Sequence, residues 1–289
     1  MGNCGSKTKV DNEEDAPTAN LGTDFTDEDW GKAHNSGDCE TCKNKLNSKG
    51  VNLQNAKSLP RPSDKSVFIC CNSYEKPEYS LGVGPINDSI SVGTYLAKQG
   101  FKIYFAHNPT SSEYKKYIKH FVENTKSVLV CYYTGHGSSI TDGNHDEVDG
   151  KDEAVVFDDD VVLDDELAEI LSKCNKPEKS KCVMINDCCH SGTIWELDSN
   201  RYRKRKTPNG IISMAASSDD QTSKQTSIGG KDQGIFTYYF FTILGNYPKI
   251  TPNEMKEKIE EYISRFNQTF TVFSTSPELK DSQIFAPMK

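Results

Sequence analysis

The sequence has no long apolar run and no secretory leader, and these two absences exclude broad classes of protein. No hydrophobic stretch approaches the ~20 residues that a membrane-spanning helix needs. The first residues do not form the basic and apolar regions of a secretory signal. We therefore expect a cytoplasmic protein, anchored to a membrane only if a lipid is attached to it.

A disulfide framework is also absent, although the chain contains 10 cysteines. Five of them lie inside strand-like apolar runs, where cysteine is usually a small buried hydrophobe: Cys70, Cys71, Cys131, Cys182 and Cys188. A reducing compartment fits this distribution. Cys39 and Cys42 form a single C-x-x-C without a second pair, so two exposed thiols are favoured over a zinc or redox role.

Negative charge is concentrated in one segment rather than spread along the chain. The net charge is −8, yet thirteen Asp or Glu and one Lys between Asp142 and Glu169 make −12 there and leave the remainder at about +4. An acidic patch this local favours a cation site and argues against nucleic acid as a partner. A solvated acidic loop is the alternative. An EF-hand is excluded because the acids before Gly143 and Gly150 lack the required spacing.

The chain divides into two parts. Residues 1–64 lack sustained periodicity and are rich in Asn, Asp, Ser, Gly and Lys, which predicts a mostly disordered arm. From 65 to 289, apolar runs predict strands at 67–71, 101–105, 128–133, 182–186, 211–216 and 269–273, and periodic segments predict helices at 87–99, 112–124, 164–173, 236–244 and 253–266. Continuous apolar strands alternating with helices predict one α/β domain with a mostly parallel sheet and helices on both faces.

Two of the predicted strands lead to a reactive side chain. The run 128–133 is followed by His136 between two glycines, and the run 182–186 is followed by Cys189. Because reactive groups gather outside the carboxyl ends of parallel strands, we expect the two side chains at one edge of the sheet. A nearby imidazole is the usual means of forming a thiolate near neutral pH, and this spacing occurs in one class of cysteine protease. The pair predicts Cys189 as nucleophile and His136 as general base.

The residues next to Cys189 are separated by the alternation of an extended segment. Cys188 and His190 should point away from Cys189, and Cys188 is predicted to pack in the core. Asp187 should lie on the same side as the nucleophile. A carboxylate there would raise the thiol pKa, so it suits the floor of a pocket for a cationic side chain better than an activating role. Backbone N–H groups of Cys189 and Gly137 would hold the oxyanion.

The segments Tyr133–Gly137 and Asp187–Gly192 resemble the two catalytic blocks of type I metacaspases, which belong to the caspase-like peptidase clan. The resemblance runs from about residue 65 to the C-terminus. It implies a caspase-like fold, a Cys–His dyad, and cleavage of proteins or peptides after Arg or Lys. It also implies that Asp88 and Thr134 join Asp187 in the pocket for the basic side chain. The family motif before Asp88 has Cys where this chain has Pro85.

The same resemblance implies dependence on calcium, with the ligands Asp152, Asp164, Asp165 and Glu196. The last of these is Asp in the family, but calcium accepts either carboxylate. The segment Arg201–Lys206 has five basic residues in six. It is typical of an exposed loop, and an enzyme that prefers basic residues could cleave itself there.

The first six residues match the pattern for myristoylation at Gly2, with Cys4 placed for palmitoylation. This pattern predicts membrane association through N-terminal acylation. A lipid-anchored scaffold with a catalytically silent caspase fold is therefore the alternative function. The intact Cys189 and His136 favour instead a monomeric, calcium-activated cysteine endopeptidase that also processes itself.

Overall fold

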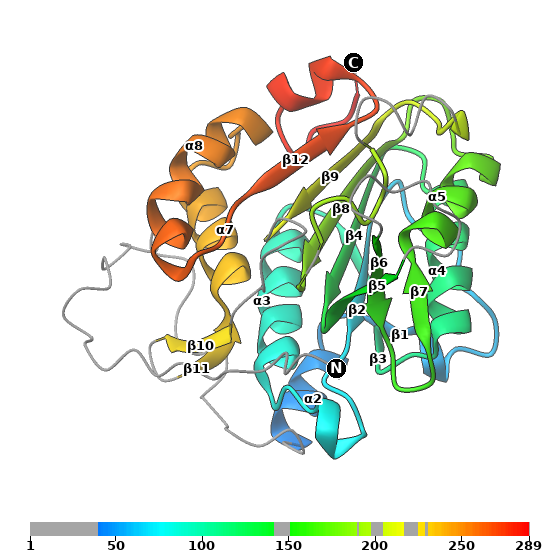
Figure 1. The fold of residues 1–289 in the computed structure, drawn as a ribbon. Helices are drawn as coiled ribbons and strands as arrows, with labels where there is room; N and C mark the ends of the chain where they lie inside the picture. The colour runs from blue at the N-terminus through cyan, green and yellow to red at the C-terminus, as the bar shows by residue number, and fades with distance from the viewer. Residues whose placement is uncertain are drawn as a thin grey trace.

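A seven-stranded sheet forms the centre of the computed structural model, which describes residues 40–141, 151–189, 191–197, 205–216, 225–228 and 231–288. The strand order is β1-β3-β2-β4-β8-β9-β12 (Figure 1). Neighbouring strands run parallel, except that β12 pairs antiparallel with β9. Within the described ranges no helix is long and apolar enough to cross a bilayer.

The strands of this sheet are β1 (Val51–Asn52), β2 (Lys65–Cys71), β3 (Lys102–His107), β4 (Val128–Thr134), β8 (Lys181–Asp187), β9 (Ile211–Ala215) and β12 (Thr271–Ser274). The α-helices described are α2 (Glu40–Asn47), α3 (Gly84–Lys98), α4 (Ser111–Asn124), α5 (Asp164–Lys173), α7 (Ile235–Asn246) and α8 (Pro252–Ile263). A small antiparallel sheet contains β5 (Gly137–Thr141), β6 (Lys151–Val156) and β7 (Val161–Leu163), and a hairpin contains β10 (Gln225–Ile228) and β11 (Lys231–Gly234). Short 3-10 helices lie at Leu53–Asn55, Pro77–Tyr79, Ser264–Phe266 and Pro277–Asp281.

Helices cover the central sheet on both faces, as the alternation of apolar strands and helices predicts (Figure 1). One hydrophobic cluster joins the sheet to α3, α7 and α8, and a second joins it to α4 and α5. Along β2, Val67 and Ile69 belong to the first cluster, whereas Phe68 and Cys70 belong to the second. This period of two places an apolar side chain on each face, and therefore the strand reads as an unbroken apolar run.

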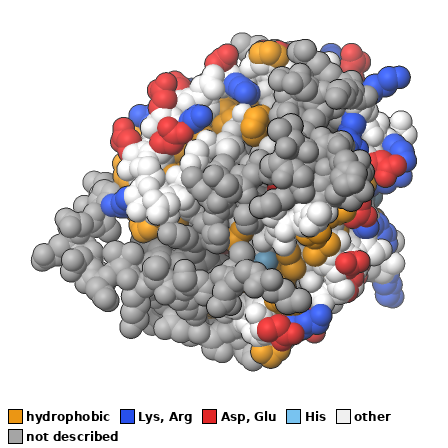
Figure 2. Space-filling view, viewed as in Figure 1, with side chains coloured by type: hydrophobic (Ala, Val, Ile, Leu, Met, Phe, Trp, Pro, Cys, Tyr) orange, Lys and Arg blue, Asp and Glu red, His pale blue; other side chains and the backbone are white. Residues whose placement is uncertain are grey.

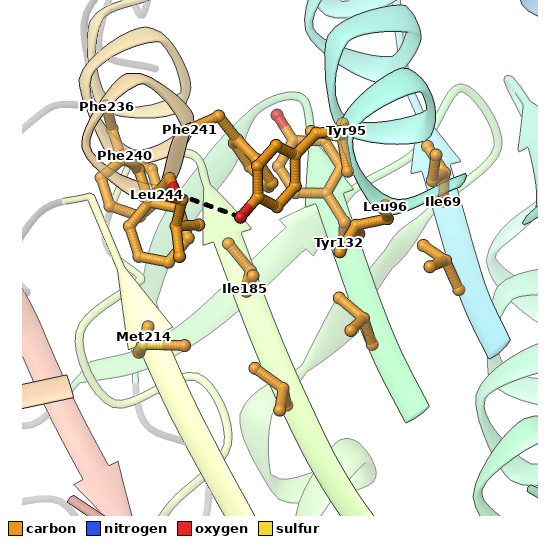
Figure 3. Close-up of a cluster of buried hydrophobic side chains, with 14 of the residues drawn as sticks. Ile69, Tyr95, Leu96, Tyr132, Ile185, Met214, Phe236, Phe240, Phe241 and Leu244 are labelled. Atoms are coloured by element: carbon orange, nitrogen blue, oxygen red, sulfur yellow. Dashed lines mark hydrogen bonds between the residues drawn. The ribbon is translucent and has the colours of Figure 1, made fainter. Parts of the chain in front are cut away.

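Helix α7 is held against the sheet by large apolar side chains (Figure 3). Those labelled in the figure are Phe236, Phe240, Phe241 and Leu244 on α7, Tyr95 and Leu96 on α3, and Ile69, Tyr132, Ile185 and Met214 on the sheet. The Tyr95 hydroxyl also donates a hydrogen bond to the carbonyl of Leu244 at 3.2 Å. These contacts fix the orientation of α7, whose first turn reaches the carboxyl edge of the sheet.

The expected disordered arm over 1–64 is wrong for residues 40–64. Helix α2 buries Cys42 and Leu46 in the cluster that contains α3, and β1 extends the sheet beside β3. The burial of Cys42 also contradicts the expectation of two exposed thiols; Cys39 lies outside the described residues. The apolar residues of this stretch are too few and too irregularly spaced to show a period, so only their tertiary contacts reveal them.

Candidate active site

The two predicted catalytic residues leave neighbouring strands at the same edge of the sheet. Strands β4 and β8 are adjacent and parallel, and Thr134 lies directly opposite Asp187 in their register. His136 and Cys189 follow these two positions by two residues each. A β-carbon at Gly137 would overlap the backbone oxygen of Cys189, so the chain after His136 touches the nucleophile turn directly. Glycine is required there because any side chain would separate the two turns.

His136 is buried and held at both its ring and its backbone. Its Nε2 lies 2.7 Å from the carbonyl oxygen of Tyr79, and its backbone N–H donates to the Tyr74 hydroxyl at 2.6 Å. Since a carbonyl only accepts hydrogen bonds, Nε2 must carry the proton and Nδ1 is left as the basic nitrogen. Burial lowers the pKa of His136, and the bond to Tyr79 partly offsets this effect. The ring is therefore neutral near pH 7, as a general base must be.

Tyr74 is a part of the site that the sequence pattern did not reveal. Its ring packs against that of His136 at a centroid distance of 4.9 Å, and its backbone adopts a φ of 65°. The Oδ1 of Asn108 accepts hydrogen bonds from the backbone N–H groups of Ser73 and Tyr74 at 2.8 and 3.0 Å. These bonds maintain the left-handed conformation that brings Tyr74 to the histidine.

The two adjacent cysteines have different surroundings. Cys188 lies in the hydrophobic cluster beneath α4 and α5, which also contains Tyr133 and Ile194. Cys189 is 5% exposed and belongs to neither cluster. Cys188 is thus a core residue, although its Sγ would lie 3.3 Å from a β-carbon at Gly137, and Cys189 contacts Gly137 through its backbone carbonyl. His190 lies outside the described residues.

The pocket residues predicted for a basic side chain lie together against one turn. The backbone N–H of Gly234 is 3.0 and 2.9 Å from the two carboxylate oxygens of Asp88. A β-carbon at Gly234 would overlap Oδ2 of Asp187 and lie 3.1 Å from Oδ2 of Asp88. Burial raises the pKa of Asp88 well above its usual value, and the charge of Asp187 raises it further. Two buried carboxyl groups in contact with one glycine are suited to a guanidinium or ammonium group, because a bound cation would favour the ionised form of both.

Pro85 fits the fold without disturbing this pocket. It lies in the first turn of α3, where a missing N–H is tolerated and the fixed φ favours the helix. Asp88 follows one turn later and is fully buried.

The four predicted calcium ligands occupy β6, α5 and the loop after Cys189, but the structure does not arrange them as a ready metal site. Among the described residues, no three His, Cys, Asp or Glu side chains converge as ligands. Arg205 forms ion pairs with Asp165 and with Glu196, the latter at 2.7 Å. Asp164 is 1% exposed, and burial raises its pKa to about 6, with Asp152 adding to the effect. The oxygen-only donor set suits a hard cation such as calcium, and in this structure Arg205 contributes positive charge to it.

Glu153, a further acid that sequence reasoning did not select, connects this cluster to the catalytic loop. It lies beside Asp164, to which its backbone N–H donates at 3.4 Å, and its Oε2 accepts from the Thr193 hydroxyl at 2.7 Å. In the same loop, Trp195 donates to Asn186 of β8 at 2.7 Å. The acidic residues are therefore linked by hydrogen bonds to the segment that follows Cys189.

Figure 2 shows the face that carries the small sheet. Described charged side chains gather over α8 on one side and over α4 and α5 on the other, and hydrophobic side chains and a histidine are visible between them. The predicted acylation sites Gly2 and Cys4 lie outside the described residues. Of the basic segment Arg201–Lys206, only the last two residues are described.

Comparison with known families identifies the fold. The model of the caspase domain matches residues 64–287, which is most of the chain. The chain belongs to the caspase-domain family. Membership of this family indicates a cysteine peptidase.

The relatives of this caspase-domain chain are metacaspases, which confirms the resemblance found in the sequence. Metacaspase-3 of Arabidopsis thaliana is 30% identical over 63% of this chain and 60% of its own length. Metacaspase-1 of Candida albicans is 21% identical over 89% of this chain and 73% of its own length. The chain thus spans about three fifths of the plant relative.

Solved structures confirm the predicted caspase-like fold. Caspase-1 from Spodoptera frugiperda has a TM-score of 0.52 at 14% identity, covering 81% of this chain and 89% of that chain. A protein from Geobacter sulfurreducens has a TM-score of 0.57 at 19% identity, covering 78% of this chain and 100% of that chain. At such low identities the likeness concerns the fold alone.

Proposed function

We propose that this chain is a cysteine endopeptidase that cleaves proteins or peptides after Arg or Lys, with Cys189 as nucleophile and His136 as base. The observation that carries the proposal is the junction of β4 and β8, where the turn after His136 contacts the backbone of Cys189. The bond from His136 to the Tyr79 carbonyl leaves Nδ1 as the proton acceptor.

The reaction follows from these groups. Nδ1 of His136 takes the proton of the Cys189 thiol, and the thiolate attacks the carbonyl carbon of the scissile peptide bond. Backbone N–H groups of Cys189 and Gly137 stabilise the negative oxygen of the tetrahedral intermediate. His136 then gives its proton to the leaving amine, and a thioester remains on Cys189. Water, deprotonated by the same imidazole, hydrolyses the thioester and restores the thiol.

Specificity for a basic residue before the scissile bond rests on Asp88 and Asp187. Both carboxylates are buried, so a charge-assisted hydrogen bond to them is little screened by water. An acidic side chain in the same position would be repelled. Thr134 lies opposite Asp187 in the register of β4 and β8 and is the third proposed residue of this pocket.

Calcium is proposed as the activator, held by Asp152, Asp164, Asp165 and Glu196. When bound, the ion would supply positive charge to carboxylates that are largely buried. Arg205 pairs with two of these residues, and therefore its guanidinium must leave them when calcium binds. Hydrogen bonds through Glu153 connect the acids to the loop after Cys189, and this connection supports a regulatory role.

A fluorogenic peptide assay on the full chain tests the proposed function. Peptides that end in Arg, Lys or Asp before the reporter are compared in calcium and in excess chelator. We expect hydrolysis of the Arg and Lys peptides in calcium only, none in Cys189→Ala or His136→Ala, and substantial activity in the matched control Cys188→Ala. Efficient cleavage after Asp would overturn the specificity, and full activity in chelator would overturn the role of calcium.

A further inference from the structure

The first turn of α7 is in direct contact with Asp187. Thr237, the third residue of the helix, donates to Oδ2 of Asp187 through its backbone N–H at 3.2 Å and through its hydroxyl at 2.6 Å. Thr237 is fully buried. Neither the catalytic blocks nor the resemblance assigns a role to this residue.

The hydroxyls of Tyr132 and Thr237 form a chain of two hydrogen bonds that ends at Asp187, and both donate in the same direction. A carboxylate oxygen only accepts, so the Thr237 hydroxyl proton points toward Asp187. The Tyr132 hydroxyl lies 2.7 Å from the Thr237 hydroxyl and must therefore be the donor in that second bond. Burial raises the pKa of Tyr132 well above its usual value, and the nearby carboxylates add to the effect. The Tyr132 hydroxyl therefore stays protonated and can act as a hydrogen-bond donor.

One turn thus supports both carboxylates of the pocket. Gly234 donates to Asp88, and Thr237, three residues later, donates twice to Asp187. Thr237 also belongs to the positive end of the α7 dipole, which favours a negative charge nearby. The apolar contacts of α7 keep this turn in place (Figure 3).

We propose that Thr237 is a positioning residue for the basic side chain of the substrate, and that it acts by keeping Asp187 ionised and correctly oriented. The inference rests on the proposed specificity for Arg and Lys. A pocket with two close carboxylates tends to take up a proton, which weakens binding of a cation. The donors of Thr237 oppose this protonation at Asp187, because hydrogen bonds to the charged form favour it.

The titratable groups around the pocket define the expected pH effect. Asp88 on α3 is the second carboxyl group of the pair, and burial and the charge of Asp187 raise its pKa well above the usual value. Tyr132 on β4 and Cys71 on β2 lie close to the pair. Burial raises the pKa values of both, Asp88 raises them further, and Asp187 adds to the effect on Tyr132. Tyr132 and Cys71 stay neutral near pH 7, so any change of substrate binding with pH comes from the two carboxyl groups. Removing the Thr237 hydroxyl removes a donor that favours the ionised form of Asp187. Affinity for a basic substrate should then fall most at low pH and recover as pH rises.

Thr237→Val and Thr237→Ser form a matched pair, because the first removes the hydroxyl at similar volume and the second keeps it. Steady-state kinetics of the full chain in calcium on an Arg peptide are measured from pH 6 to 9. We expect Thr237→Val to raise KM about ten- to hundredfold at pH 6.5, as loss of a hydrogen bond to a charged group should, with a smaller rise at pH 9. Thr237→Ser should stay close to the native protein.

Two measurements separate positioning from folding. Thermal melting should show both variants folded, with Thr237→Val somewhat less stable because a buried carboxylate loses a donor. The rate of Cys189 alkylation by iodoacetamide, which needs no basic substrate, should not fall in either variant. Native-like KM in Thr237→Val, or slowed alkylation in that variant with no rescue by Ser, would overturn the inference while the proposed function stands. If the native chain does not cleave after Arg or Lys, the proposed function fails as well.

Discussion

Replacement of Asp164 by Asn should stabilise the protein when no calcium is present. Asp164 is 1% exposed, and burial raises its pKa to about 6, whereas an unfolded chain would give about 3.9. A difference of about two pKa units corresponds to at most about 3 kcal/mol lost when the carboxylate ionises in the native state. The bond from the backbone N–H of Asp165, 2.8 Å long, can be accepted equally well by the Asn oxygen, whereas the 3.4 Å bond from Glu153 to the other carboxylate oxygen is lost and reduces the gain. We therefore expect Asp164→Asn to gain about 1–2 kcal/mol at pH 7.5.

The sign of the pH dependence follows from the direction of the shift. Because the native pKa is the higher one, the native state binds the proton more tightly, and stability falls as pH rises from about 4 to about 6. Above that range the loss is constant. The variant lacks this titration, so its advantage should be near zero at pH 4 and complete above pH 6.5. For a domain of this size the gain corresponds to a melting temperature about 2–8 °C higher.

Differential scanning fluorimetry in chelator, from pH 4 to 8, measures this difference. Cys189→Ala serves as the background so that self-cleavage cannot interfere. Glu178→Gln, which changes an exposed carboxylate, is the control and should leave the melting temperature unchanged. Excess calcium should reverse the order, since only the native cluster keeps its full charge. A melting temperature of Asp164→Asn below that of its background at pH 7.5 would refute the reasoning. A difference in melting temperature that does not change with pH would also refute it.

Three further predictions concern other parts of the molecule. Arg205→Gln should tighten calcium binding in isothermal titration calorimetry by about tenfold, because no guanidinium then competes for Asp165 and Glu196; weaker binding would contradict the displacement. The acid limb of kcat at saturating Arg peptide should have its midpoint below 6.5, since burial lowers the pKa of His136; a midpoint above 6.5 would contradict this. Gly2→Ala should move the protein from membrane to soluble fractions, and mass spectrometry that finds an unmodified native Gly2 would exclude acylation.

The sequence alone predicts the parts of the fold whose signals are local. Helix α5 begins at Asp164 as expected, because three acids in its first turn suit the helix dipole. Strands β4 and β8 are continuous apolar runs, and their parallel pairing brings His136 and Cys189 to one edge. The reactive pair could therefore be expected together without any knowledge of loop structure.

Other parts of the site depend on contacts that leave no local pattern. The partner of His136 is the backbone carbonyl of Tyr79, and any residue type could supply it. Thr237 reaches Asp187 from 50 residues further along the chain, through the packing of α7. Arg205 is one of five basic residues in the segment Arg201–Lys206, and its pairing with Asp165 depends on tertiary contacts.

The hairpin β10–β11 and the small sheet β5–β7 cannot be predicted from the sequence for a related reason. Their strands are short, and β10, β11 and β6 contain polar residues such as Gln225, Asp232 and Glu153. Pairing with a neighbour, rather than apolar periodicity, makes these segments strands. Gly234, at the end of β11, reaches the pocket only through that pairing and its contact with α3.

The central claim is that Cys189 attacks the carbonyl after a basic residue. A peptidyl chloromethyl ketone ending in Arg, incubated with the full chain in calcium and followed by peptide mapping, tests it most directly. The account predicts one adduct, on Cys189, formed much more slowly in His136→Ala and suppressed by excess Arg peptide. An adduct on Cys188, or equal labelling by the corresponding Asp reagent, would contradict it.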